Sequence, residues 1–176
     1  MDETLIQSKD VVVKLYKELG VDMPEDAWGK PWREWLPEAM GMPEFEAEFL
    51  HTEKTARMLK EDLRWLPMVD VIVDAVINRQ IPWGIMTGAS RQMLYRISIE
   101  LQNIVQIPPG VMVAEARIHE KREVLLRVSM SRPDIRICYV DDDLEMGREI
   151  VKGTNAFLVH YTGQNASELM EEIWTP

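Results

Sequence analysis

The amino-acid sequence predicts an α/β fold, in which helices cover a parallel sheet and a further group of helices precedes most of the strands. From residue 81 onward, short apolar runs alternate with helical patterns. Before residue 81, apolar residues recur at helical spacing and prolines interrupt the pattern. Strands that alternate with helices are joined by right-handed crossovers, so we expect their sheet to be parallel.

The composition is that of a folded, acidic protein. Hydrophobic residues make up 46% of the chain and charged residues 28%, as in ordinary globular domains. Thirty acidic residues against twenty basic ones give a formal net charge of -10, which disfavours nucleic acids and anionic membranes as partners. The single cysteine, Cys138, excludes an internal disulfide, and no apolar run is long enough to span a bilayer. We therefore expect a cytoplasmic protein. If its substrate is anionic, the protein must offset its own charge locally with a bound metal ion or a few placed cations.

The first part of the chain is expected to form short helices. Ser8 can cap a helix that Gly20 ends in the left-handed conformation. Further helical patterns cover residues 31–40, 44–63 and 68–78. Prolines between these segments keep them short, because a proline removes a backbone donor and breaks a helix.

Four apolar runs after residue 81 predict the strands of the sheet. They lie at residues 83–86, 111–113, 135–140 and 156–159. Helices are expected from Ser90, around Lys121 and after Asp143. In such sheets ligands bind beyond the carboxyl ends of the strands, so the polar residues at these ends are the candidate site.

The segment Thr87-Gly88-Ala89-Ser90 follows the first of these strands and opens a helix. Its hydroxyls and the unpaired N–H groups of the helix start would form an anion site. The alternative is a simple helix cap, because serine, threonine and glycine are common there.

Asp141, Asp142 and Asp143 follow the third strand. Adjacent carboxylates repel one another unless a cation shares them, and magnesium prefers such oxygen donors. The alternative is a solvated turn in which aspartate caps the following helix.

Lys121 is expected near a helix start, one crossover before the acidic cluster. Its ammonium could neutralise a phosphoryl group or keep a nucleophilic carboxylate ionised. A solvated surface lysine is the alternative.

The start of the chain, Met1-Asp2-Glu3-Thr4-Leu5, would by itself suggest a frayed terminus. In chain order, however, the four segments resemble the ordered motifs of the haloacid-dehalogenase superfamily. These motifs are an Asp-x-Asp-x-Thr-Leu strand end, a strand-ending Thr or Ser, a lysine, and an acidic cluster after an apolar strand. The sequence is most similar to the phosphoglycolate-phosphatase-like and phosphoglucomutase-like branch, whose members have a helical cap.

The resemblance implies a three-layer α/β/α core with a Rossmann-like parallel sheet and an inserted cap. Residues 1–8 and 81–176 would form the core, and residues 9–80 the cap. Met1 would stand between the two aspartates of the first motif. The nucleophilic aspartate and the central first strand are therefore expected upstream of Met1.

The resemblance also implies the roles of individual residues. Asp2 would be the general acid and base, and the catalytic set would be Asp2, Thr87 and Lys121. Thr87, Gly88 and Lys121 would bind the phosphate, with Arg122 as a nearby alternate for the lysine. Asp2, Asp141 and Asp142 would hold Mg²⁺. The reaction would pass through an aspartyl-phosphate, which divides one displacement into two easier steps.

The most unusual part of the expected cap is the segment of residues 29–35. Lys30 and Arg33 could meet an anionic substrate tail. Trp28, Trp32 and Trp35 fall on one helical face. The alternative is that the tryptophans pack the interior of the cap and the two cations are solvated.

The function predicted from these patterns is magnesium-dependent hydrolysis of a small phosphorylated metabolite by a monomer or homodimer, with neither a nucleic acid nor a membrane as partner. One alternative is a non-catalytic protein of the same fold that binds a ligand or a partner. A phosphomutase is a second alternative. Dehalogenation is disfavoured, because that chemistry does not require the metal site that Asp141 and Asp142 suggest.

Overall fold

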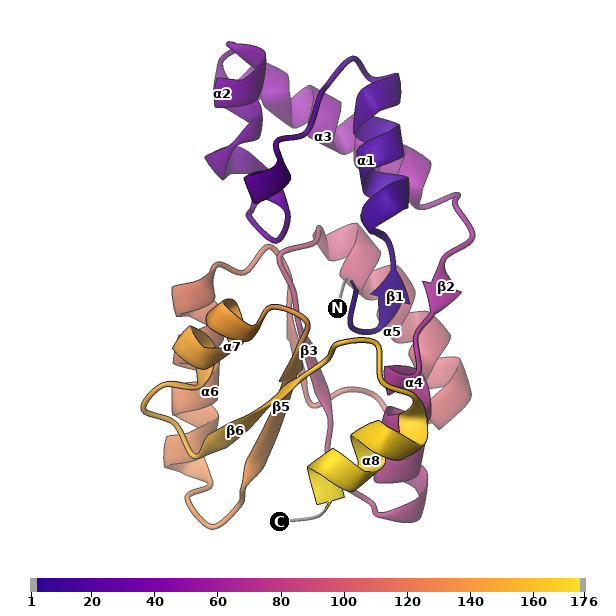
Figure 1. Ribbon diagram of the computed structural model, residues 1–176, viewed down its shortest axis with the longest axis vertical. Coiled ribbons are helices and arrows are strands. Elements are labelled where there is room, and N and C mark those ends of the chain that lie inside the picture. The colour runs from indigo at the N-terminus through magenta and orange to yellow at the C-terminus, as the bar shows by residue number, and fades with distance from the viewer. Residues whose placement is uncertain (1–2, 175–176) are drawn as a thin grey trace.

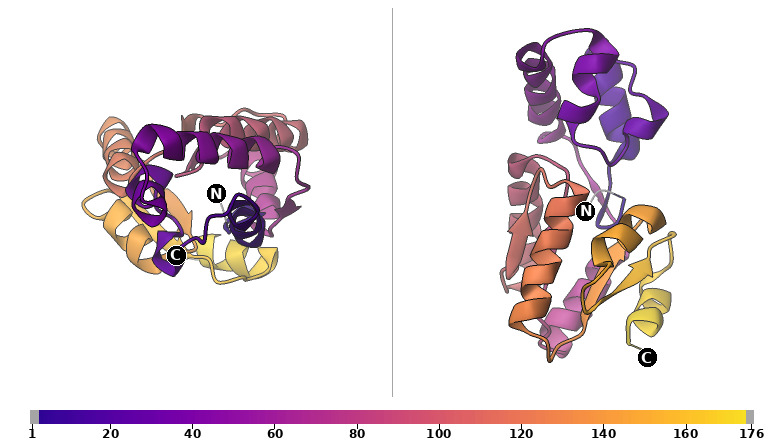
Figure 2. Two further views of the ribbon diagram at one scale, coloured as in Figure 1. Left: turned by 90° about the horizontal axis from the view of Figure 1, so that it is seen from above. Right: turned by 90° about the vertical axis from the view of Figure 1, so that its left-hand side faces the viewer.

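The computed structural model describes residues 3 to 174, which form two layers (Figure 1). The helices of residues 9–58 lie above the strands (Figures 1 and 2), and we call them the helical layer. This layer contains α1 (Lys9–Glu18), η1 (Glu25–Ala27), η2 (Trp32–Glu34), α2 (Leu36–Met40) and α3 (Glu44–Met58). Among the described residues, no helix has the length and apolar character needed to cross a bilayer.

The lower layer contains two pairs of parallel strands flanked by helices. The strands are β3 (Gly84–Met86), β4 (Val111–Val113), β5 (Ile137–Asp141) and β6 (Ala156–His160). The helices are α4 (Met68–Val73), continued by the π-helical turn η3 (Asp74–Asn78), α5 (Arg91–Val105), α6 (Ile118–Ser131), α7 (Leu144–Val151) and α8 (Ala166–Trp174). The predicted α/β class with parallel strands is confirmed.

Hydrogen bonding divides the strands into two halves. β3 pairs with β4 and β5 pairs with β6, and among residues 3–174 no ladder joins β3 to β5. Met86 of β3 nevertheless packs against the apolar cluster of Leu125, Tyr139 and Ile150. One edge of β3 and one edge of β5 are therefore without a strand partner in the described chain, although the two halves share an apolar cluster.

Two tight contacts require glycine in the lower layer. A Cβ atom on Gly84 would lie 2.9 Å from the carbonyl oxygen of Val111, so β3 and β4 approach closely only because Gly84 has no side chain. A Cβ atom on Gly147 of α7 would lie 2.6 Å from Leu158 of β6. Both glycines let an element pack closely against a neighbouring strand.

Two short strands connect the layers. β1 (Ile6–Gln7) pairs antiparallel with β2 (Arg64–Trp65), where the chain enters and leaves the helical layer. The buried side chains of Leu5 and Ile6 belong to the apolar cluster that also contains residues of α1 and α5. The layers are thus joined by a two-stranded ribbon and by continuous apolar packing.

The division into a core (residues 1–8 and 81–176) and a cap (residues 9–80) stays a prediction. α4 falls inside the expected cap, but it lies beside α5 and α8 of the lower layer. Val71 of α4 packs in one apolar cluster with Val159 and Leu169.

Side chains cap α5 and α7 as expected, whereas the Ser8 side chain makes no cap hydrogen bond at α1. Ser90 Oγ accepts the Met93 N–H at 3.3 Å and caps α5, and Asp143 Oδ1 accepts the Met146 N–H at 2.9 Å and caps α7. At α1, the carboxylate of Glu3 accepts the N–H groups of Ser8 and of the residue after it, each at 2.7 Å. A carboxylate at this end also interacts favourably with the helix dipole.

The single helix expected over residues 31–40 is divided into η2 and α2. Pro37 lies in the first turn of α2, where its missing N–H would have no partner within the helix. Gly41 then ends α2 in the left-handed conformation with φ of 59°. The segment therefore forms the 3-10 turn η2 followed by the short helix α2, and not one continuous α-helix.

Candidate active site

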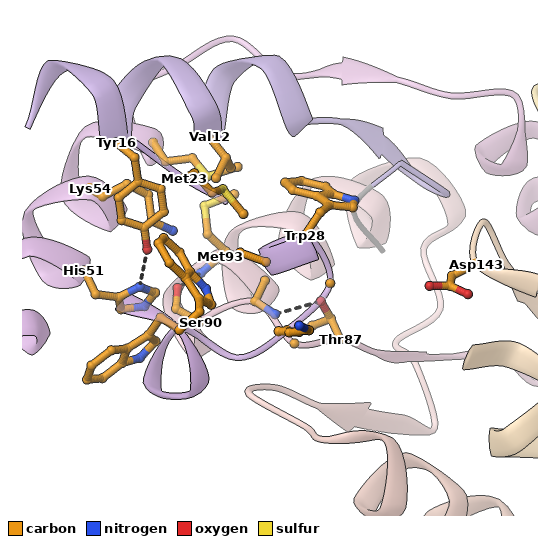
Figure 3. Close-up of a pocket in the computed structure, with 18 of the residues that line it drawn as sticks. Val12, Tyr16, Met23, Trp28, His51, Lys54, Thr87, Ser90, Met93 and Asp143 are labelled. Atoms are coloured by element: carbon orange, nitrogen blue, oxygen red, sulfur yellow. Dashed lines mark hydrogen bonds between the residues drawn. The ribbon is translucent and has the colours of Figure 1, made fainter. Parts of the chain in front are cut away.

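A cavity of about 140 Å³ lies between the helical layer and the ends of β3 and β5 (Figure 3). From the lower layer it is lined by residues that follow or end strands and by side chains of α5, α6 and α7. These residues include Thr87, Gly88, Ser90, Lys121, Asp141 and Asp142. Polar residues that are far apart in the sequence are therefore brought to one cavity.

The turn after β3 is held by several hydrogen bonds. Thr87 is 2% exposed, and its N–H donates to the carbonyl of Val113 at 2.8 Å. Its Oγ1 accepts the Ala89 N–H at 3.0 Å. Gly88 lies beneath the helical layer, since a Cβ atom there would be 3.6 Å from the carbonyl oxygen of Gly29. The turn thus places a threonine hydroxyl and the N-terminus of α5 at the cavity.

The acidic cluster after β5 is ordered by its own hydrogen bonds. Asp141 is buried; its Oδ2 accepts the hydroxyl of Tyr139 at 2.6 Å, and its Oδ1 accepts the Asp143 N–H at 3.0 Å. Asp142 Oδ1 accepts the hydroxyl of Thr4 at 2.9 Å. Burial, and then the charge of Asp141, raise the pKa of Asp142, while the hydrogen bond from Thr4 opposes this rise. A cation bound here would favour the ionised form of both carboxylates.

The side chains of Lys121 and Arg122 lie in different surroundings, although the residues are adjacent in the sequence. Lys121 of α6 is 7% exposed and lines the cavity. Arg122 instead donates from Nε to the carbonyl of Lys152 at 3.0 Å and lies 3.4 Å from the carboxylate of Glu149. Of the two, only Lys121 is placed where it could meet an anion in the cavity.

Among the described residues, the candidate donors for a metal ion are Asp141 and Asp142. Among residues 3–174 there is no group of three or more His, Cys, Asp or Glu side chains that could hold a metal ion. Asp2, the third expected ligand, lies outside the described residues. Magnesium is commonly bound by one or two carboxylates and completed by water or phosphate oxygens, and each carboxylate oxygen keeps a lone pair beyond its hydrogen bond. The two carboxylates therefore fit magnesium.

The helical layer contributes a polar group that the sequence analysis missed. Tyr16 Oη and His51 Nδ1 lie 3.1 Å apart, and Lys54 Nζ lies 5.4 Å from the centre of the Tyr16 ring. The imidazole also stacks on Trp32, with 5.1 Å between the ring centres. All of these residues line the cavity. The available signal was spacing, because His51 and Lys54 follow Ala47 at the helical intervals of a buried stripe.

His51 and Tyr16 are both uncharged at neutral pH. Burial, and then the charges of Lys54 and Arg33, lower the pKa of His51 to about 3. Burial raises the pKa of Tyr16 well above its ordinary value. They therefore act as a hydrogen-bonding pair without charge.

The depressed pKa of His51 predicts a loss of stability in acid. The unfolded chain binds a proton below about pH 6.5 that folded His51 does not bind until about pH 3. Neutral, buried His51 therefore contributes to the free energy of unfolding above about pH 6.5, and this contribution falls as the pH drops from about 6.5 to about 3. Between about pH 7.5 and about pH 5, we expect the wild type to lose at most about 2 kcal/mol more than His51→Gln. Urea unfolding at both pH values measures the difference. His119→Gln, at an exposed position of α6, is the matched control, and equal losses in wild type and His51→Gln would contradict the prediction.

The structure also separates the two cations expected to meet a substrate tail. Lys30 lines the cavity, with its Nζ 2.7 Å from the carboxylate of Asp26. Arg33 does not line it; its Nε lies 3.1 Å from Glu44, and its guanidinium lies 4.5 Å from the centre of the Trp32 ring. Arg33 lines a different groove on the surface.

The prediction that the three tryptophans fall on one helical face is wrong, because η1 ends at Ala27, η2 covers Trp32–Glu34 and α2 begins at Leu36. Trp32 and Trp35 are buried in the largest apolar cluster, and Trp28 packs against that cluster. All three also line the cavity.

Cys138 is partly buried, and burial raises the pKa of its thiol to about 12, which keeps the thiol protonated.

The fold is similar to that of solved haloacid-dehalogenase-like hydrolases. A HAD hydrolase of family IA, variant 3, from Entamoeba histolytica superposes with a TM-score of 0.67 at 14% identity, over 97% of this chain and 86% of that chain. CbbY from Rhodobacter sphaeroides, solved in complex with phosphate, superposes with a TM-score of 0.63 at 13% identity, over 93% and 85%. A putative beta-phosphoglucomutase from Thermotoga maritima gives 0.52 at 19% identity, over 98% and 96%.

These comparisons confirm the predicted resemblance at the level of the fold. Neither a protein-family profile nor a curated protein sequence matches the chain. The roles of individual residues therefore rest on the geometry of the cavity.

Proposed function

We propose that the protein is a magnesium-dependent phosphohydrolase acting on a small phosphorylated metabolite. The observation that carries this proposal is the cavity at the strand ends, which is lined by Thr87, Lys121 and Asp141 together. A hydroxyl and a helix N-terminus, a buried ammonium and a pair of carboxylates are the groups that phosphoryl transfer uses for binding and charge stabilisation. The fold of the neighbouring solved structures supports the same class of chemistry.

The described residues divide the work between the two strand ends. The Thr87 hydroxyl and the backbone N–H groups at the start of α5 would hold the phosphoryl oxygens, and Lys121 would balance their charge. Asp141 and Asp142 would hold Mg²⁺, which when bound would withdraw charge from the phosphoryl oxygens. The acidic protein would thereby present a local positive field to an anionic substrate.

The attacking group is proposed from the resemblance. The three carboxylates described at the cavity, Asp141, Asp142 and Asp143, all accept hydrogen bonds that hold them at the end of β5. We assign the attack to an aspartate on a strand upstream of Met1, whose place would be between the unpaired edges of β3 and β5. Its oxygen would bond to phosphorus while the ester oxygen leaves with a proton from Asp2. Water, deprotonated by Asp2, would then break the acyl-phosphate and release inorganic phosphate.

The first test of this proposal is binding. Inorganic phosphate titrated calorimetrically into the 176-residue protein should bind at least about tenfold more tightly when magnesium is present, because the metal links the anion to the carboxylates. Asp141→Asn should remove this magnesium dependence. Asp134→Asn is the matched control, since Asp134 is exposed and paired with Arg132.

Equal phosphate affinity with and without magnesium would contradict the proposed metal site. Absence of phosphate binding under both conditions would contradict the phosphohydrolase and favour a protein of the same fold with a different ligand. Transfer of the phosphoryl group to a second position of a sugar, without release of phosphate, would instead indicate a mutase.

A further inference from the structure

Tyr139 and Asp141 lie on the same face of β5, which α6 and α7 cover. The side chains of a strand point alternately to its two faces. Cys138 and Val140 pack in the apolar cluster of α4 and α8, whereas Tyr139 packs with residues of α6 and α7. Asp141 follows Tyr139 by two residues, at the end of the strand that borders the cavity. Tyr139 is therefore the residue of β5 whose side chain can reach the carboxylate of Asp141 from within the strand.

The hydroxyl of Tyr139 is not required for packing. The residue is 9% exposed and lies in an apolar cluster, where the ring of phenylalanine would fill the same space. A buried hydroxyl is unfavourable unless it forms a hydrogen bond. The Tyr139 hydroxyl donates to Asp141 Oδ2 at 2.6 Å. The hydroxyl therefore acts on the carboxylate of Asp141.

The carboxylate of Asp141 is held at both of its oxygens. Oδ2 accepts the hydroxyl of Tyr139, and Oδ1 accepts the Asp143 N–H at 3.0 Å. One donor comes from the strand and the other from the turn after it, so together they fix the plane of the carboxylate. Each oxygen keeps a lone pair for a cation, but a hydrogen bond at each oxygen competes with chelation of one cation by both. Asp141 is therefore arranged to meet a cation through one oxygen, from a fixed direction.

This arrangement suits Mg²⁺ better than Ca²⁺. Mg²⁺ requires a nearly ideal octahedron of oxygens at about 2.0–2.1 Å. Ca²⁺ accepts about six to eight oxygens in a flexible geometry and often takes both oxygens of one carboxylate. A carboxylate that is fixed and offers a single oxygen thus favours the smaller ion.

We propose that Tyr139 is a positioning residue that makes the acidic cluster select Mg²⁺ over Ca²⁺. It acts through Asp141, because its hydroxyl holds the carboxylate in the orientation that Mg²⁺ requires. This inference rests on the proposed function, which places Mg²⁺ at Asp141 and Asp142. Removing a group that orients a metal ligand typically lowers metal affinity by about 10- to 100-fold.

The test is the substitution Tyr139→Phe, which keeps the ring and removes the hydroxyl. Mg²⁺ alone and Ca²⁺ alone are titrated calorimetrically into the 176-residue protein and into the variant. We expect the wild type to bind Mg²⁺ about tenfold or more tightly than Ca²⁺. In Tyr139→Phe the affinity for Mg²⁺ should fall about tenfold or more, while that for Ca²⁺ stays within about threefold, because the released oxygen allows chelation.

Two controls separate positioning from a general loss of structure. Tyr161→Phe also removes the hydroxyl of a buried tyrosine, directly after β6 and in the cluster of α4 and α8, and should keep the wild-type preference for Mg²⁺. Inorganic phosphate titrated without metal should bind Tyr139→Phe within about twofold of the wild type, since the phosphate groups at the end of β3 are unchanged.

The outcomes separate the two proposals. A wild type that binds Ca²⁺ as tightly as Mg²⁺ would overturn the role of Tyr139 and leave the phosphohydrolase standing, and this measurement does not depend on the folding of a variant. An unchanged preference in folded Tyr139→Phe, or an equal loss of affinity for both ions, would also overturn this role. Failure of the wild type to bind Mg²⁺ at all would overturn the proposed metal site itself.

Discussion

A protein extended ahead of Met1 by an apolar strand ending in aspartate is expected to release phosphate from an aryl phosphate roughly a thousandfold or more faster than the 176-residue chain. The expectation follows from the two strand edges that lack partners among residues 3–174. A parallel strand between β3 and β5 would bring its terminal carboxylate to the same edge as Thr87 and Asp141. There the carboxylate could attack a phosphoryl group held by these residues.

The extension should also stabilise the protein. Each buried backbone group that gains a partner avoids a penalty of about 1 to 3 kcal/mol, so the free energy of unfolding should rise together with the activity. Phosphate release and urea unfolding are measured for both lengths, purified in parallel. The same extension ending in asparagine is the control and should stabilise the fold without restoring turnover. Strong turnover by the 176-residue chain that Asp2→Asn abolishes would show instead that Asp2 attacks.

Replacing Lys121 by methionine is expected to lower the turnover of the extended protein by roughly a hundredfold or more, because a preorganised charge aimed at the phosphoryl oxygens is lost. The affinity for inorganic phosphate should fall as well. Methionine retains the apolar part of the side chain, which is buried in α6, so the free energy of unfolding should change little.

The matched control for this loss is Arg127→Met on the same helix, where the side chain is 76% exposed and reaches the carboxylate of Glu123. Steady-state turnover and phosphate titrations are compared for wild type, Lys121→Met and Arg127→Met. Wild-type turnover of Lys121→Met would show that another group neutralises the charge of the phosphoryl oxygens. Arg122 is not its substitute, since its guanidinium is bound to the carbonyl of Lys152.

Much of the lower layer could be predicted because its signals are local. The apolar runs of β3 to β6 alternate with helical patterns, and Ser90 and Asp143 stand where helix caps belong. In a parallel sheet the carboxyl ends of the strands meet at one edge. The order of strands and helices therefore already placed Thr87 and Asp141 at a common site.

The tertiary structure alone decided which neighbouring side chains reach that site. Lys121 and Arg122 are adjacent in sequence, yet one lines the cavity and the other binds the end of α7, because successive residues of a helix point about 100° apart. Lys30 lines the cavity while Arg33 is drawn to the carboxylates of α3. Periodicity identifies the buried face of a helix but not the surface that this face meets.

The same limit explains why the polar group of the helical layer was missed in the sequence. Tyr16 lies on α1 and Lys54 on α3, and only the packing of these two helices over the strand ends brings them to the cavity. The burial that lowers the pKa of His51 likewise arises from contacts between distant segments. The sequence by itself determined the fold class and the polar residues at the strand ends, because both follow from local patterns. The tertiary structure decided the opposite wall of the cavity, because its charge and its neutral pair depend on contacts between residues far apart in the chain.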